Sequence, residues 1–375
     1  MFFLIGGLLF LGSGATQPYI VPYLKGLGYS SSIASLVIAV IYISQIPFRF
    51  FIHRLERSFG QIPVVFIGIG GYALYSFIFA LGSNLWQFFL ATSILGFSSA
   101  LFWTSGVVLL LNNTSTERYG RAVGALYAGV GFGTAIGVLW LNKILAVFGG
   151  KVMFSLAGIP PIIGLLLLSK LRLDNVVVSK PITFSSLREI ATKETFMVSI
   201  LLFISSFSYG IVYSGFSILI SREIGLAWIG VLSISFYLLK SLFSRIGGGI
   251  SDFLGRRFSF IISFIFGALA SLMLGLAKSS IAFIISGALL GFQVSTVSVN
   301  ANAWIADMAG LSDRSNYMAF IFTFNALGVA ISLLASGYLL STSERTFTAF
   351  ISFTLLNITA IIISFFAGRR ETVYA

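Results

Sequence analysis

The sequence predicts an all-α integral membrane protein with twelve transmembrane helices. Its 375 residues are 57% hydrophobic and only 9% charged, whereas soluble domains carry about 25% charged residues. The apolar residues form continuous runs, and a helix needs about 20 such residues to cross the hydrocarbon core of a bilayer. Strands of a membrane β-barrel would be about ten residues long and would alternate in polarity. Most of the protein surface is therefore expected to face lipid.

The first apolar run has two interpretations. Its first ten residues are followed by the small residues Gly12 to Ala15, an arrangement that loosely resembles a signal peptide. The run lacks a basic segment at its start, however, and it stays apolar beyond Pro18 as far as Leu24. Because this length is enough to span a membrane, we expect the first transmembrane helix at 2–24.

Eleven further apolar runs follow, and the charged residues fall between them. The predicted helices are 32–52, 62–81, 87–111, 121–145, 152–169, 196–220, 227–247, 258–277, 281–305, 317–341 and 346–367. The longest polar interruption, 170–195, contains five basic and three acidic residues and lies almost at the midpoint of the chain. Within it, residues 184–192 form either a short amphipathic helix on the inner membrane surface or an irregular tether.

The net charge of +12 comes from 23 Lys and Arg against 11 Asp and Glu. These charges separate apolar runs instead of covering one face, so we expect loops that face lipid headgroups and no nucleic-acid partner. If both termini are cytoplasmic, 17 of the 23 basic residues, Arg49 included, lie on the cytoplasmic side, as the positive-inside rule requires. The chain has no cysteine, which excludes disulfides and cysteine-bound metals, and we expect no metal and no cofactor.

The two halves of the sequence are related by a repeat. Gly60 follows the second predicted helix and Gly255 follows the eighth, 195 residues apart, and Arg118 and Arg314 lie 196 residues apart after the fourth and tenth. Duplicated six-helix halves with a site between them near the membrane midplane are typical of secondary transporters. The expected domains are therefore a six-helix bundle at 1–169, a cytoplasmic central loop at 170–195 and a second six-helix bundle at 196–375.

A motif follows the eighth predicted helix. It reads Gly248-x-x-x-Asp252-x-x-Gly255-Arg256-Arg257, with Arg245 three residues before the first glycine. This segment resembles the loop signature of the major facilitator superfamily, and the helix count and repeat extend the resemblance over the whole chain. The resemblance implies two pseudo-symmetric bundles that work as a rocker switch, with Asp252 locking neighbouring helices in the outward-facing state. The first half departs from the pattern, because Arg57 stands at the position that matches Asp252.

The same resemblance implies that helices 1, 4, 7 and 10 line the substrate cavity. Helix 10 carries a polar stripe at helical spacing that includes Gln293, Thr296, Asn300 and Trp304. The candidates on helices 1, 4 and 7 are Gln17, Trp103, Thr104, Tyr209 and Tyr213. Aromatic rings combined with amides favour a neutral or anionic organic molecule. Hydrogen bonding between helices is the alternative for each of these residues.

Lys240 is the charged residue that the sequence embeds most clearly in a span, in the inner half of predicted helix 8. Its side chain either reaches toward the inner interface or faces the cavity and binds an anionic or polar substrate. Every acidic residue falls in or near a loop, so the sequence offers no carboxylate in the middle of the membrane for proton coupling. On helix 5, Gly129, Gly133 and Gly137 share one face and predict close packing against a neighbouring helix.

The sequence therefore predicts a secondary transporter, not an enzyme, that moves a small organic solute across the cell membrane by alternating access. The expected partners are that solute and the lipid bilayer; the expected state is a monomer, although the sequence leaves the oligomeric state open. An integral-membrane enzyme acting on a lipid or prenyl substrate is one alternative, but it would need clustered acids or an activated nucleophile. A membrane scaffold or receptor that no longer transports is the other.

Overall fold

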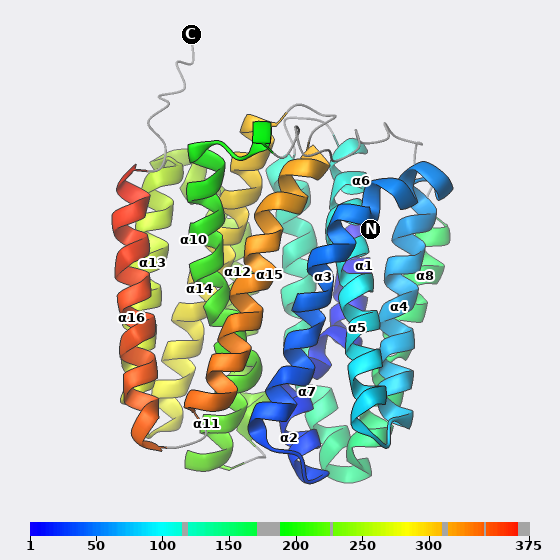
Figure 1. The fold of residues 1–375 in the computed structure, drawn as a ribbon, viewed down its shortest axis with the longest axis vertical. Helices are drawn as coiled ribbons and strands as arrows, with labels where there is room; N and C mark the ends of the chain where they lie inside the picture. Colours follow the sequence, from blue (N-terminus) through cyan, green and yellow to red (C-terminus); the bar gives the residue numbers. More distant parts are fainter. Residues whose placement is uncertain (115–118, 171–187, 226–227, 310–313, 341–342, 367–375) are drawn as a thin grey trace.

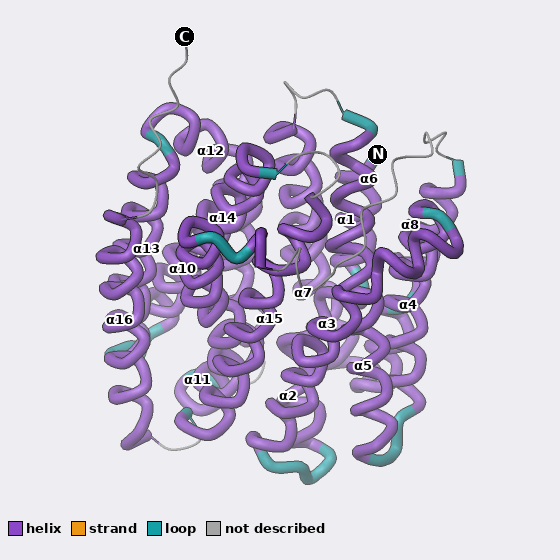
Figure 2. Tube along the Cα trace, turned by 45° about the horizontal axis from the view of Figure 1, so that its top comes forward, coloured by secondary structure: helices purple, strands orange, loops and turns teal. Residues whose placement is uncertain are grey.

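The computed structural model describes residues 1–114, 119–170, 188–225, 228–309, 314–340 and 343–366. Within these ranges every regular element is a helix, and the helices stand side by side in one bundle (Figure 1 and Figure 2). The chain starts at the same end of the bundle at which α16 finishes (Figure 1). The main chain of the described part therefore crosses the bundle an even number of times, as the prediction requires.

In the first half of the chain the described residues form six crossings. The first crossing is divided into two α-helices by a 3₁₀ turn, η1, and the fourth contains a short π-helical segment, η2. The elements are α1 (Phe2–Leu11), η1 (Ser13–Thr16), α2 (Gln17–Gly26), α3 (Ser31–Phe59), α4 (Gln61–Leu81), α5 (Leu85–Leu101), η2 (Phe102–Gly106), α6 (Val107–Asn112), α7 (Tyr119–Ala157) and α8 (Ile159–Ser169).

In the second half the described residues form six more crossings, of which the first contains a π-helical segment, η4. The elements are α10 (Lys193–Gly210), η4 (Ile211–Gly215), α11 (Phe216–Glu223), α12 (Ile229–Leu254), α13 (Arg256–Gly275), α14 (Ser280–Met308), α15 (Arg314–Leu339) and α16 (Ser343–Phe366). The first crossing of each half is therefore irregular, with η1 in the first half and η4 in the second.

The twelve predicted spans are all accounted for by these helices. In the described part of the chain, ten helical stretches are long and apolar enough to cross a membrane. One of them, 122–169, has 48 residues and holds two predicted spans, because Gly149 at φ 79° reverses the chain within it. A shorter apolar helix at Ile229–Ser244 supplies the remaining predicted span. The all-helical membrane fold is thus confirmed.

The repeat is visible in the backbone of the two matching turns. Gly60 has φ 87° and ψ 160°, and Gly255 has φ 82° and ψ 153°. Such positive φ angles are accessible to glycine without strain, so in each half one glycine ends a helix and the next helix begins at the following residue. The predicted loops after helices 2 and 8 are therefore wrong in extent, since α3 continues to Phe59 and α12 continues to Leu254.

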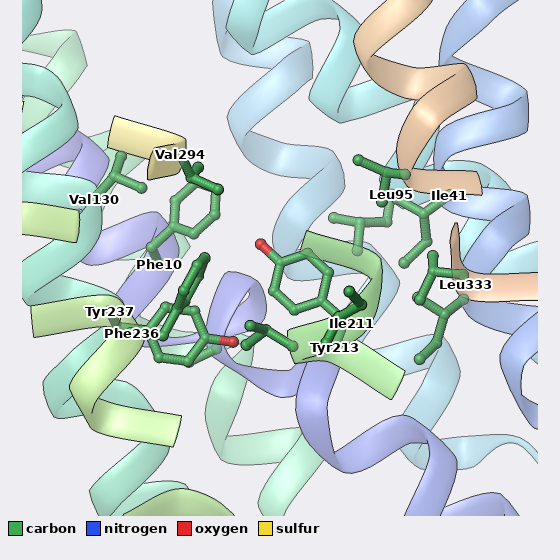
Figure 3. Packing of buried hydrophobic residues seen from close by; sticks show 14 of the residues in the cluster. Phe10, Ile41, Leu95, Val130, Ile211, Tyr213, Phe236, Tyr237, Val294 and Leu333 are labelled. Carbon is green, nitrogen blue, oxygen red and sulfur yellow. The ribbon is translucent and has the colours of Figure 1, made fainter. Parts of the chain in front are cut away.

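The two halves meet along two main helix pairs, α3 with α15 and α7 with α12. A single apolar cluster contains residues from both halves, such as Phe10 and Ile41 from the first and Ile211, Tyr213 and Leu333 from the second (Figure 3). The central segment 171–187, which includes the first four residues of the predicted amphipathic helix 184–192, lies outside the described residues, and residues 188–190 of that prediction are helical. The domain boundaries and the orientation in the membrane stay predictions.

Packing of the glycines on α7 is confirmed. A Cβ atom on Gly129 would lie within 3.0 Å of the backbone of Phe3, and one on Gly133 would do the same with Gly7. A Cβ atom on Gly137 would lie 2.7 Å from the carbonyl oxygen of Leu11. Small residues at this spacing let two helix backbones approach closely where lipid offers no hydrophobic driving force. These contacts fix α1 against α7 and thereby position the first-half wall of the cavity described below.

Candidate functional site

A cavity of about 80 Å³ lies between the two halves. Its wall is formed by eight crossings, four from each half. The lining residues are Phe10, Gln17, Tyr42, Gln45, Arg49, Ser99, Trp103, Tyr127, Val130, Tyr209, Tyr213, Lys240, Ser298, Phe322, Asn325 and Val329.

Aromatic side chains make up much of the wall. Tyr42 on α3 and Tyr213 on η4 stack across the boundary between the halves, with ring centroids 6.4 Å apart and an interplanar angle of 18°. Trp103 lies against Tyr127, at 5.2 Å, and against Phe10, at 5.8 Å. Such flat faces can hold a ring of a bound molecule by stacking.

Amide groups lie beside these rings. The Tyr42 hydroxyl donates to Gln17 Oε1 at 2.8 Å, and Asn325 Nδ2 donates to the hydroxyl of Ser206 at 2.6 Å. A few polar groups placed in a mostly apolar wall are what fixes the orientation of a ligand in binding sites generally.

Two cationic side chains also face this cavity. Arg49 is 3% exposed and Lys240 is 6% exposed. Arg49 Nη2 donates to Gln45 Oε1 at 2.9 Å, and its guanidinium lies 5.4 Å from the ring centroid of Phe322 on α15. Lys240 Nζ lies 4.7 Å from the ring centroid of Tyr209. Each cation thus touches an aromatic face, an arrangement that is weakly attractive.

The position of Arg49 corrects the sequence analysis, which counted it among the cytoplasmic basic residues. Because α3 continues to Phe59, Arg49 lies ten residues before the end of the helix, which is about 15 Å at 1.5 Å per residue. The same extension buries Glu56 in the last turn of α3, at 3% exposure, where Ser105 Oγ donates to Glu56 Oε1 at 2.7 Å. Glu56 therefore faces η2.

Five of the predicted cavity residues lie in the wall: Gln17, Trp103, Tyr209, Tyr213 and Lys240. They come from four different crossings, so the fold brings together residues that are far apart in the sequence. Lys240 lies against Tyr209 and is buried. The sequence allowed its side chain either to reach the inner interface or to face the cavity, and the structure has the second arrangement. The part that these residues play in substrate binding stays a prediction.

The other four predicted cavity residues, and Thr296 of the same helix 10 stripe, are not among the lining residues. Gln293 accepts a hydrogen bond from Ser208 at 2.8 Å and donates one to Asn357 at 2.5 Å, within the second half. The remaining three are buried elsewhere: Thr104 in η2, Asn300 with its Nδ2 donating to the carbonyl of Arg256 at 3.5 Å, and Trp304 against Phe260 at 6.1 Å. Helix α14 contributes Ser298 to the wall instead. The bonds of Gln293 join α14 to α10 and α16, so this residue takes part in hydrogen bonding between helices, the alternative to a place in the cavity.

The predicted gating motif lies at the end of α12 and the start of α13. The side chains of Arg245 and Asp252 lie outside the described residues, as does the surrounding of Gly248. Gly255 forms the turn between the two helices. The Arg257 guanidinium lies 5.1 Å from the ring centroid of Phe365 on α16, and the Arg256 carbonyl accepts the bond from Asn300. The locking role of Asp252 stays a prediction.

Sequence reasoning missed the contribution of α3. Tyr42, Gln45 and Arg49 are spaced by three and four residues and so share one helix face. This polar stripe lay inside the predicted span 32–52 and was a usable signal. Tyr127 on α7 and Asn325 on α15 were also missed, and single residues of this kind give no pattern in a sequence.

Comparison with known proteins gives two results. A family model described as "Major Facilitator Superfamily" matches residues 2–220 and again 198–374. The chain is 26% identical over 151 residues to "Quinolone resistance protein NorA" of Staphylococcus aureus, covering 40% of this chain and 39% of that protein. It is 26% identical over 148 residues to "Multidrug resistance protein 2" of Bacillus subtilis, covering 40% of this chain and 37% of that protein. The alignments thus span about two fifths of these relatives.

Proposed function

Because the chain belongs to the major facilitator superfamily of membrane transporters, we propose that it moves a small organic solute across the cell membrane by alternating access. The solute binds in the cavity between the halves, which open in turn to either side. The two halves are 1–169 and 196–375, joined by a cytoplasmic loop, and both termini face the cytoplasm. Asp252 stabilises the outward-facing state.

The observation that carries this proposal is the shared wall of the cavity, to which both halves contribute. The contacts between the halves are also of a kind that can separate. Ser35 Oγ on α3 and Ser214 Oγ on η4 form a hydrogen bond of 2.7 Å, and Ser217 Oγ donates to the carbonyl of Pro18 at 2.7 Å. Single hydroxyl bonds of this type contribute only about 1 kcal/mol each, so a rotation of one half against the other can break them.

The size of the cavity supports a change of shape during the cycle. A cavity of about 150 Å³ binds benzene, and this one has about 80 Å³. In the arrangement that the structure shows, the cavity is therefore small for an organic solute, and the proposed cycle widens it when the halves move apart. The names of the two relatives refer to resistance to quinolones and to multiple drugs, which accords with an organic substrate.

The test is uptake into proteoliposomes that contain the purified protein, against protein-free liposomes. The compounds offered are small aromatic molecules of four charge classes: anions, zwitterions, neutral molecules and cations. We expect at least one class to enter faster with protein present, and the compound to exchange against itself when it is loaded inside. Equal uptake of every compound into both kinds of vesicle would contradict the proposed function and favour a scaffold or receptor.

A further inference from the structure

Two buried cations, one from each half, share the central cavity. Arg49 comes from α3 and Lys240 comes from α12, and both lie in its wall. The only partner atom that Arg49 has by hydrogen bonding is Gln45 Oε1, and its Nε has no hydrogen-bond partner among the described residues. Lys240 contacts the face of Tyr209. Within the described chain neither cation is paired with a carboxylate.

The surroundings do not neutralise these charges. None of the lining residues that the structure describes is acidic. The buried acid on the same helix as Arg49 is Glu56, seven residues and about 10 Å along the axis away, and its carboxylate accepts a hydrogen bond from Ser105. The aromatic faces of Phe322 and Tyr209 attract the cations but carry no net charge. The cavity wall that the structure describes is therefore positive.

An unpaired buried cation is costly, because its charge has lost the hydration that it has in water. The guanidinium of Arg49 cannot escape this cost by losing its proton. A ligand carboxylate, sulfonate or phosphonate would restore the missing interactions, and the planar guanidinium can bind two oxygens of such a group at once. Because both side chains are buried, the attraction is also stronger than between the same charges in bulk water.

We propose that the substrate is an organic anion whose acidic group binds between Arg49 and Lys240, with its ring against the aromatic wall. This inference rests on the proposed transport function and names the substrate class of the same cavity. Because one cation belongs to each half, the bound anion connects the halves and stabilises the arrangement in which they are closed around it. Binding of the negative charge thus both selects the substrate and closes the cavity around it.

The test uses three matched triads: benzoate, 2-naphthoate and indole-3-acetate, each with its amide and its corresponding ammonium compound. Members of a triad share a ring and differ in charge. We expect the acid of at least one triad to enter proteoliposomes about tenfold faster than its amide, and its ammonium counterpart not to be carried. Arg49→Gln and Lys240→Gln should each lower uptake of that acid about tenfold or more, as expected for loss of a hydrogen bond to a charged group.

Two variants serve as matched controls. Arg54→Gln removes an exposed cation from the same helix as Arg49, and Lys278→Gln removes an exposed lysine from the second half; both should leave uptake unchanged. Arg49→Lys, which keeps the charge, should retain the preference for the acid over the amide. Gel filtration of every variant confirms that it is folded.

The outcomes separate the two proposals. If the amides or ammonium compounds are carried as well as the acids, or if Arg49→Gln and Lys240→Gln behave like the controls, the anion proposal is wrong. The same holds if no acid is carried while compounds of another charge class are, and transport then stands. If no compound of any class is carried, the transport function itself fails.

Discussion

A disulfide between positions 35 and 214 is expected to abolish transport completely and reversibly. Ser35 and Ser214 belong to different halves, and their hydroxyl oxygens lie 2.7 Å apart. In Ser35→Cys/Ser214→Cys, oxidation should join the halves near the end of the bundle where α3 begins and prevent their separation there. The protein has no other cysteine, so this is the one disulfide that can form within a molecule. Uptake of a transported compound should cease after oxidation and return after reduction with dithiothreitol.

The matched control places the same kind of bond within one half. Ser271 on α13 and Thr354 on α16 also have hydroxyl oxygens 2.9 Å apart, and both lie in the second half. Oxidised Ser271→Cys/Thr354→Cys should transport normally, because in the proposed cycle each half moves as a rigid body. If mass spectrometry shows the 35–214 disulfide and uptake continues at the reduced rate, the halves do not separate at this contact.

The second large effect is expected from Gly133→Ala. The added Cβ would lie within 3.0 Å of the backbone of Gly7, and backbone atoms cannot move aside as a flexible side chain can. Helices α1 and α7 must therefore separate, at a cost of about 3 kcal/mol, the upper end of the range for overpacked cores. We expect a large drop in the melting temperature in detergent and loss of the monodisperse peak in gel filtration.

Gly26→Ala is the control for this substitution. Gly26 ends α2, and no heavy atom lies within 4 Å of a Cβ atom built on it. Its melting temperature should match that of the wild type. A Gly133→Ala protein as stable as Gly26→Ala would show that the close packing of α1 against α7 is not needed for the fold.

The fold could be predicted from the sequence because the membrane limits the choices. A lipid-facing chain must satisfy its backbone groups within each helix, so apolar runs of sufficient length identify the helices. Helix ends were less predictable. A single glycine such as Gly60 or Gly255 is enough for the turn between two helices, whereas the polar residues before it suggested a loop.

The candidate site was only partly predictable. Gln17, Trp103, Tyr209, Tyr213 and Lys240 were found because the family resemblance pointed to particular helices and because a lysine inside a span is unusual. Arg49 was missed because the count of basic residues assigned it, near the predicted inner end of the span 32–52, to the cytoplasmic side. Which face of a helix lines the cavity depends on tertiary packing, and the sequence does not show that packing. The polar stripe of α14 was therefore assigned to the cavity, although Gln293 donates a hydrogen bond to Asn357.

The most direct test of the account measures distances between spin labels at both ends of the bundle, in lipid nanodiscs. One pair, at Ser83 and Lys278, lies at the end where α4 and α13 finish; the other, at Ser58 and Leu254, lies at the end where α3 and α12 finish, and each pair joins the two halves. We predict two distance populations for each pair, with a transported compound lengthening one distance where it shortens the other. A single distance at both ends, unchanged by any transported compound, would contradict alternating access through this cavity.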